Sequence, residues 1–190
     1  MAARGLSAMA GVLTLRTWRR LFVVGVVIVV VQVGLLQQVT VANVHPDAFL
    51  LVAICAGLVA GPQSGAVVGF VTGLVADLFV VTPYGLSALC YVLVAFTVGQ
   101  TASLPGGRAP HLFKVVTAFL GSIGGTLLYL GLAILVGQPH LARAQLVDVL
   151  AVVSVANAVL AVPGVAAMRW AFSANAQQSR ELATAGVSRG

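Results

Sequence analysis

The stretch GLVAGPQSGAVVGFVTGLVAD, residues 57–77, carries a glycine at every fourth position and ends on an acid. Five glycines keep this step, and the acid takes the next one: Gly57, Gly61, Gly65, Gly69, Gly73 and Asp77. Glycine is a poor helix former in water, and a lone carboxylate is costly in an apolar run. The stretch therefore indicates a surrounding other than water. Its small residues also need a structural explanation.

The composition identifies that solvent. The chain has 190 residues, of which 60% are hydrophobic and 7% are charged, and its mean hydropathy is +1.08. A soluble domain carries about 25% charged residues, so this chain has too few charges to cover a surface facing water. Long apolar runs indicate lipid instead. We expect an all-α, multi-pass protein of the cell membrane.

Six apolar runs follow one another between turn signals. They cover residues 21–36, 48–60, 64–81, 86–99, 113–136 and 146–170. The residues Gly-Pro-Gln-Ser at 61–64 and Thr-Pro-Tyr-Gly at 82–85 form the two tightest turns. We expect a basic cytoplasmic arm at residues 1–20, a six-helix membrane domain at 21–172 and a flexible cytoplasmic tail at 173–190.

The basic residues test this count of spans. With six spans and both termini in the cytoplasm, nine basic residues lie inside and Arg143 alone lies outside. An alternative that fuses residues 48–81 into one span gives five spans and divides the basic residues five against five. Membrane proteins keep their Lys and Arg in cytoplasmic loops, so six spans are favoured. The inside set is Arg4, Arg16, Arg19, Arg20, Arg108, Lys114, Arg169, Arg180 and Arg189.

The formal net charge of +6 is accordingly a signal of topology. Nucleic-acid binding is not expected, because no aromatic platform is interleaved with the basic residues. Cys55 and Cys90 lie in apolar runs and are interpreted as small buried hydrophobic residues. No metal-ligand spacing, phosphate loop or nucleotide motif occurs, so we expect neither a cofactor nor an enzyme.

The glycines of the third run predict a close helix contact. Gly65, Gly69, Gly73 and Asp77 trace one slowly winding stripe, because steps of four residues drift by about 40° on a helix. In lipid, helices associate through close packing, and small residues mark the contact. The fifth run is the predicted mate of this stripe, with Gly121, Gly124, Gly125 and Gly131.

Asp77 is the only acid in the interior of a predicted span, away from its ends, which makes a functional role the default interpretation. No lysine or arginine lies in a span interior to pair with it. Two interpretations stay open: a polar clamp between helices, and a proton or ligand site. Asp47 and Asp148 are interpreted as loop or helix-start acids. Hydroxyl groups at similar depth are offered by Ser87, Tyr91, Tyr129 and Ser154.

Residues Pro46 to Phe96 resemble the rod shape-determining protein MreD family. The family pattern opens a short helix with a proline and passes a glycine-rich turn. It then reads roughly G-F-x-x-G-L-x-x-D-L, followed by P-x-G-L and a helix with an aromatic residue. The matching residues here are Gly69-Phe70, Gly73-Leu74, Asp77-Leu78, Pro83, Gly85-Leu86 and Tyr91.

The resemblance implies a non-enzymatic component of the bacterial elongation complex, which controls cell shape and side-wall peptidoglycan synthesis. Its implied partners are MreC, the cytoskeletal MreB, and the peptidoglycan glycosyltransferase and transpeptidase. The implied bundle is similar to the S components of energy-coupling-factor transporters, so a vitamin- or metabolite-binding transporter subunit is the alternative. The residues implied in helix packing or partner binding are Gly65, Gly69, Phe70, Gly73, Asp77, Pro83 and Gly85.

Overall fold

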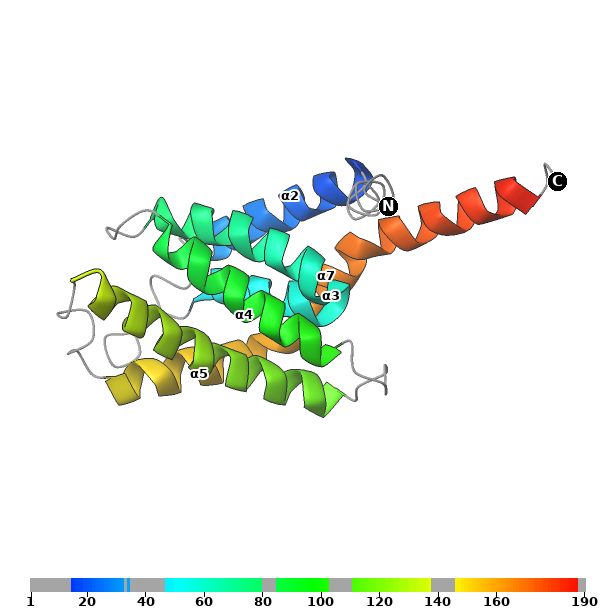
Figure 1. The fold of residues 1–190 in the computed structure, drawn as a ribbon. Helices are drawn as coiled ribbons and strands as arrows, with labels where there is room; N and C mark the ends of the chain where they lie inside the picture. Colours follow the sequence, from blue (N-terminus) through cyan, green and yellow to red (C-terminus); the bar gives the residue numbers. More distant parts are fainter. Residues whose placement is uncertain are drawn as a thin grey trace.

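The computed structural model describes residues 15–32, 34, 47–79, 85–102, 111–137 and 146–187, and every structural statement below concerns these residues. They form helices and turns without a strand, which confirms the all-α prediction for this part of the chain. The helices lie side by side along a common direction (Figure 1). They are α2 (Leu15–Val31), α3 (Ala48–Asp77), α4 (Leu86–Ala102), α5 (His111–Leu135) and α7 (Leu146–Val187).

Helix α3 folds back on itself at Gly61. The backbone of Gly61 has φ 81° and ψ −179°, a conformation that suits glycine, and Pro62 follows without a backbone N–H. The stacked rings of Phe49 and Phe79 have centroids 6.1 Å apart. A continuous helix would separate these residues by about 45 Å. Residues 48–60 and 62–77 are therefore two limbs joined by the predicted Gly-Pro turn, and the single span required by the five-span alternative is not present.

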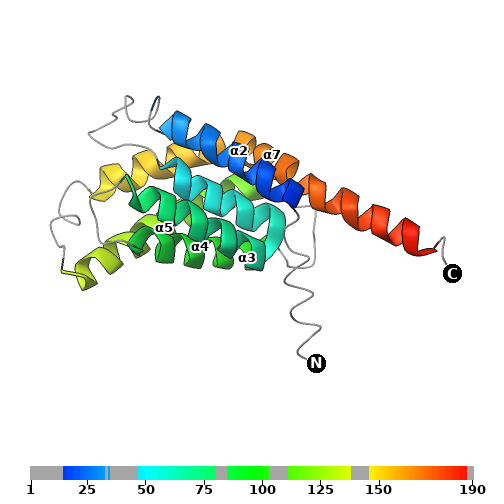
Figure 2. The same cartoon turned by 90° about the horizontal axis from the view of Figure 1, so that it is seen from above.

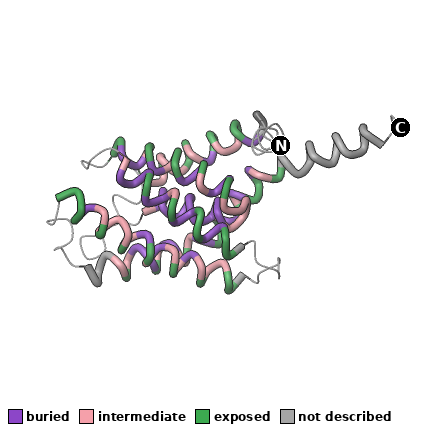
Figure 3. Tube along the Cα trace, in the orientation of Figure 1, coloured by how far each residue is buried: buried purple, intermediate pink, exposed green. Residues whose placement is uncertain are grey.

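The first limb of α3 is the centre of the bundle. All ten residues from Ala48 to Gly57 are buried, as expected of a helix that is apolar all round (Figure 3). Leu50 packs against Gly125 of α5, Ile54 packs against Gly121 of α5, and Cys55 packs against Gly164 of α7. Helices α4, α5 and α7 thus share one core through this limb.

The outward faces of the surrounding helices are also apolar. Phe22 on α2, Leu120 on α5 and Val159 on α7 are 73%, 60% and 70% exposed, respectively. Three helices are long and apolar enough to cross a membrane: Ala48–Asp77, Leu112–Leu135 and Leu150–Ser173. Because α3 reverses direction, its two limbs extend only about 20 and 24 Å, short of the ~30 Å hydrocarbon core. The first limb is enclosed by the other helices, so it does not have to match the lipid thickness alone.

The described cations gather at one end of the bundle. A side-chain N–H of Arg20 on α2 donates to the Trp170 carbonyl oxygen of α7 at 2.8 Å, and its guanidinium lies 4.9 Å from the centre of the Trp170 ring. Lys114 of α5 and Arg169 of α7 line a common cavity. Because adjacent segments run in opposite directions, these side chains meet although they lie far apart in the sequence.

Asp47 and Asp77 lie at the other end. Asp47 precedes α3 and Asp77 ends it, and the stack of Phe49 on Phe79 joins these two points of the chain. The bundle therefore has a basic end and an acidic end. The sequence indicated an excess of basic residues on one side, and the fold places the described members of that set together.

The end of α7 extends past the other helices (Figure 2). The sequence predicted a flexible tail at residues 173–190, whereas the helical backbone continues to Val187. Residues 174–187 contain Ala, Gln, Arg, Glu and Leu, which favour helix. At the other terminus, α2 begins at Leu15, inside the predicted arm 1–20, and the arm's earlier residues lie outside the described part of the chain.

Candidate functional site

The glycine stripe forms a backbone-to-backbone seam with α4. A Cβ atom added to Gly69 would lie 2.6 Å from the carbonyl oxygen of Tyr91. One added to Gly73 would overlap the backbone of Ala88. Real Cβ atoms essentially never come within 3.0 Å of such a neighbouring atom, so only glycine allows these approaches. The stripe therefore sets the spacing of α3 and α4, as close packing in lipid requires.

The seam continues across the reversal of α3. An added Cβ on Gly57 would overlap the carbonyl oxygen of Ala95, and one on Gly65 would lie 2.6 Å from the Cα of Gly57. Gly99 of α4 in turn lies against Pro62. The four-residue period thus runs through both limbs. It gives three segments, the two limbs and α4, a common line of close contact.

The predicted mate of the stripe was wrong. The stripe packs on α4, whereas the glycines of α5 lie elsewhere. Gly121 and Gly125 receive side chains of the first limb, and nothing lies within 4 Å of a Cβ added to Gly124 or Gly131. We expected glycine to face glycine, whereas the stripe mainly faces backbone atoms of Ala88, Tyr91 and Ala95 on α4.

Asp77 is a cap for the following helix. Its side chain is 1% exposed. The Gly85 amide donates to Oδ2 at 2.7 Å, and the Ser87 amide donates to Oδ1 at 3.1 Å. The Ser87 amide belongs to the first turn of α4 and the Gly85 amide directly precedes this helix. Backbone N–H groups at a helix start lack partners within the helix, and negative charge is favoured there. The carboxylate thus satisfies two donors at the start of the next helix.

This geometry supports the polar-clamp interpretation of Asp77. The partners are backbone amides, and none of the hydroxyl groups considered from the sequence donates to the carboxylate in a described hydrogen bond. Gly85 has φ 98°, which lets the chain turn sharply enough for its amide to point back at α3. Pro83, the other turn residue of the predicted set, lies outside the described residues.

Asp47 is a second cap and is linked to the seam. Its Oδ1 accepts from the Leu50 amide at 3.0 Å, which confirms the helix-start interpretation, and its Oδ2 accepts from the Tyr91 hydroxyl at 2.5 Å. Burial raises the pKa of the Asp47 carboxyl, while the hydrogen bonds from Tyr91 and Leu50 lower it. The Gln32 side chain accepts from the Ala48 amide at 2.9 Å and completes this cap.

Tyr91 links the Asp47 cap to the glycine seam. Its carbonyl oxygen lies in the seam against Gly69, and its hydroxyl reaches the Asp47 cap. The ring is 5% exposed. One residue of α4 therefore contacts the start of the first limb and the middle of the second. The sequence marked Tyr91 as the aromatic residue of the family pattern and as a possible partner of Asp77, but its acid partner is Asp47.

A buried polar group joins α5 to α7. The Asn157 amide nitrogen donates to the Ser122 hydroxyl at 3.0 Å, and this hydroxyl donates to the Ala118 carbonyl oxygen at 2.8 Å. Ser154 Oγ and Asn157 Oδ1 are buried without a hydrogen-bond partner among the described residues. Interhelical bonds of this kind hold helices together in lipid.

The remaining predicted residues take several positions. Phe70 is 50% exposed, so it points away from the seam although its neighbour Gly69 lies in it. Cys55 and Cys90 are free and buried, which confirms their interpretation as small buried residues. In the described part of the chain, no three His, Cys, Asp or Glu side chains come close enough to hold a metal ion.

Taken together, these contacts describe a structural site. The carboxylates of Asp47 and Asp77 cap helices, and the glycines of the stripe contact the backbone of α4. In its described part, the chain is all-helical and has three helices long and apolar enough to cross a membrane. Comparisons with protein-family models, with curated proteins and with solved structures gave no match.

Proposed function

We propose that this chain is a non-enzymatic membrane component of the bacterial elongation complex, of the MreD type. In this role it would help control cell shape by binding an MreC-like protein in the membrane. MreB and the peptidoglycan glycosyltransferase and transpeptidase would belong to the same complex. The proposal rests on the resemblance of residues 46–96 to the family, together with the contacts that these residues make.

One observation carries the proposal further than the residue pattern alone. Asp77 of the segment G-F-x-x-G-L-x-x-D-L binds the amide of Gly85 in the segment P-x-G-L. Gly69 and Gly73 of the first segment pack on Tyr91 and Ala88 of the helix that follows. These matched residues therefore hold α3 and α4 together, which gives the pattern a physical basis.

The proposed topology has six crossings, with both termini in the cytoplasm of a bacterial cell. In this proposal the two limbs of α3 would supply the second and third crossings, and the bundle would have the S-component arrangement that the family resemblance implies. The basic end formed by Arg20, Lys114 and Arg169 supports this orientation, because cytoplasmic ends carry the positive charge. The end with Asp47 and Asp77 would face outward.

The structure directs the search for a partner surface away from the glycines. Gly69 and Gly73 are buried in the contact between α3 and α4. Their replacement would therefore disturb the fold itself and would not report on a partner surface. Phe70 is half exposed on the face of the second limb that points away from α4. Within the family-like segment it is an apolar side chain available to a partner helix.

Co-purification with the MreC-like protein of the same organism tests the proposal. The Phe70→Ala variant should weaken the association, whereas Leu120→Ala, which truncates an apolar side chain 60% exposed on α5, should leave it unchanged. Depletion of the chain should round rod-shaped cells, and wild-type chain should restore them. Normal shape on depletion together with no MreC association would overturn the proposal.

The transporter alternative has one observation in its favour, the unpartnered Ser154 Oγ and Asn157 Oδ1. A metabolite would need a cavity with several polar groups on its wall. The cavity beside α2 has apolar walls, and these two atoms do not line it. A thermal-shift screen with vitamins and metabolites decides between the two: a saturable stabilisation by one compound would favour the alternative.

A further inference from the structure

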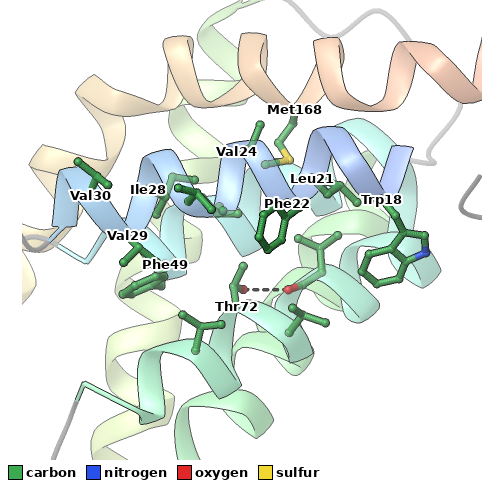
Figure 4. A pocket seen from close by; sticks show the side chains of 16 residues that line it. Trp18, Leu21, Phe22, Val24, Ile28, Val29, Val30, Phe49, Thr72 and Met168 are labelled. Carbon is green, nitrogen blue, oxygen red and sulfur yellow. Dashed lines mark hydrogen bonds between the residues drawn. The ribbon is translucent and has the colours of Figure 1, made fainter. Parts of the chain in front are cut away.

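An apolar groove of about 330 Å³ runs between α2 and the second limb of α3 (Figure 4). Leu21, Val24 and Ile28 of α2 form one wall of the groove. Val68 and other residues of α3 form the opposite wall, and Met168 of α7 also lines the groove. The groove exists because α2 packs mainly on α7 and touches α3 at few points.

The groove offers an occupant few polar groups, and the Trp18 indole N–H at one end is one of them. Its one hydroxyl, on Thr72, donates within its own helix to the Val68 carbonyl oxygen at 2.9 Å, as the dashed line in Figure 4 marks. Phe22 and Val71, on either side of the opening, are 73% and 40% exposed. In a membrane these rims face lipid, so the natural occupant is a hydrocarbon chain.

One end of the groove is basic. Trp18 and Phe22 line both the groove and an adjoining hollow that also contains Arg19 and Arg20. Arg20 is held by hydrogen bonds to the Trp170 carbonyl oxygen and the Ser173 hydroxyl, at 2.8 and 2.9 Å. Arg19 is exposed and makes no hydrogen bond or ion pair with any described residue. An arginine fork fits the oxygens of a phosphate group.

The length and volume of the groove suit a single acyl chain. From Trp18 to Val30, α2 rises about 18 Å, close to one leaflet of a hydrocarbon core ~30 Å thick. A helix with side chains is about 10–12 Å wide, so a partner helix four turns long would displace on the order of 2,000 Å³. The cavity of about 330 Å³ is much smaller.

We propose that this groove binds one acyl chain of an anionic phospholipid, with the lipid phosphate on Arg19 and Trp18 at the level of the headgroup. Basic pockets between membrane helices on the cytoplasmic side bind anionic headgroups, and tryptophan is enriched at membrane interfaces. The site rests on the membrane orientation proposed above, but it does not require the partnership with an MreC-like protein. The bound lipid would fill the space between α2 and α3, which make few contacts with each other.

A glycine on the groove wall gives a direct test. Gly25 lines the groove, and nothing lies within 4 Å of a Cβ added there, so Gly25→Leu should fill the groove without a clash. Gly131→Leu on α5 is the matched control, because its Cβ also meets open space and it is not part of the groove. Native mass spectrometry of the purified chain would count bound dioleoyl phosphatidylglycerol.

We expect wild type and Gly131→Leu to retain this lipid and Gly25→Leu to retain at least five-fold less. Arg19→Gln should abolish the preference for phosphatidylglycerol over phosphatidylcholine of the same chains, whereas Lys114→Gln should keep it. Unchanged retention by a folded Gly25→Leu, verified by its melting temperature without lipid, would overturn the proposal. So would an equal loss of preference in Lys114→Gln, which would indicate diffuse surface charge. Loss of a co-purified membrane helix instead of lipid in Gly25→Leu would also overturn it.

Discussion

The carboxylate of Asp77, at the end of α3, accepts a hydrogen bond of 2.7 Å from the amide of Gly85, directly before α4. A second bond from the Ser87 amide, 3.1 Å long, uses the other oxygen. One side chain thus ends one helix and caps the next. The acid that stood out in the sequence as a possible proton or ligand site holds the corner between two closely packed helices.

Replacement of Asp77 should destabilise this corner. Asp77→Ala removes a helix cap, a loss of typically about 0.5–2 kcal/mol, and leaves two buried amides without acceptors. Asp77→Asn keeps one acceptor oxygen and should cost less. Thermal unfolding in detergent measures both variants. Equal stability of Asp77→Ala and wild type would contradict the capping role.

Replacement of Gly69 by alanine should force α3 and α4 apart. The new Cβ would lie 2.6 Å from the Tyr91 carbonyl oxygen, and overpacking of this kind costs typically about 1–3 kcal/mol. Gly124→Ala is the control, because its Cβ meets open space and alanine is the better helix former. The control should unfold at or above the wild-type temperature. A similar loss of stability in both variants would mean that α3 and α4 do not pack as closely at Gly69 as this structure shows.

Tyr91→Phe should destabilise the start of α3 by removing the hydroxyl that donates to Asp47. A hydrogen bond to a charged group contributes about 1.5–3 kcal/mol. The double variant with Asp47→Asn separates this bond from the cap: if the two residues interact, the combined loss should be smaller than the sum of the single losses. Strictly additive losses would rule out a direct bond.

The reversal of α3 can be tested by cross-linking. In a background with Cys55 and Cys90 replaced by alanine, cysteines at Phe49 and Phe79 should join rapidly through a short bifunctional thiol reagent, because the two rings stack at 6.1 Å. A continuous helix would hold them about 45 Å apart. Cysteines at Phe49 and Phe113, at opposite ends of the bundle, should not join. Slow linking of the first pair would argue for a continuous helix.

Much of the fold could be predicted from local sequence signals. The apolar composition and the lack of charge predicted helices in lipid, because an unsatisfied backbone in that solvent is too costly. The Gly-Pro pair at Gly61 and Pro62 predicted the reversal of α3, since it removes a helical donor and permits a positive φ. Asp47 was recognised as a helix-start acid from its place before an apolar run. Each of these inferences depends on neighbours in the chain.

The tertiary structure decided which surfaces meet. The glycine period marked a close contact but did not identify α4 as its partner, because alanines and a bare backbone leave no signal comparable to glycine. The role of Asp77 also required the fold, since its partners are backbone amides, which every sequence position offers equally. The sequence by itself determined the solvent, the helical segments and the small face of α3. Only the folded chain determined what that face touches, because close packing depends on the shapes of both partners at once.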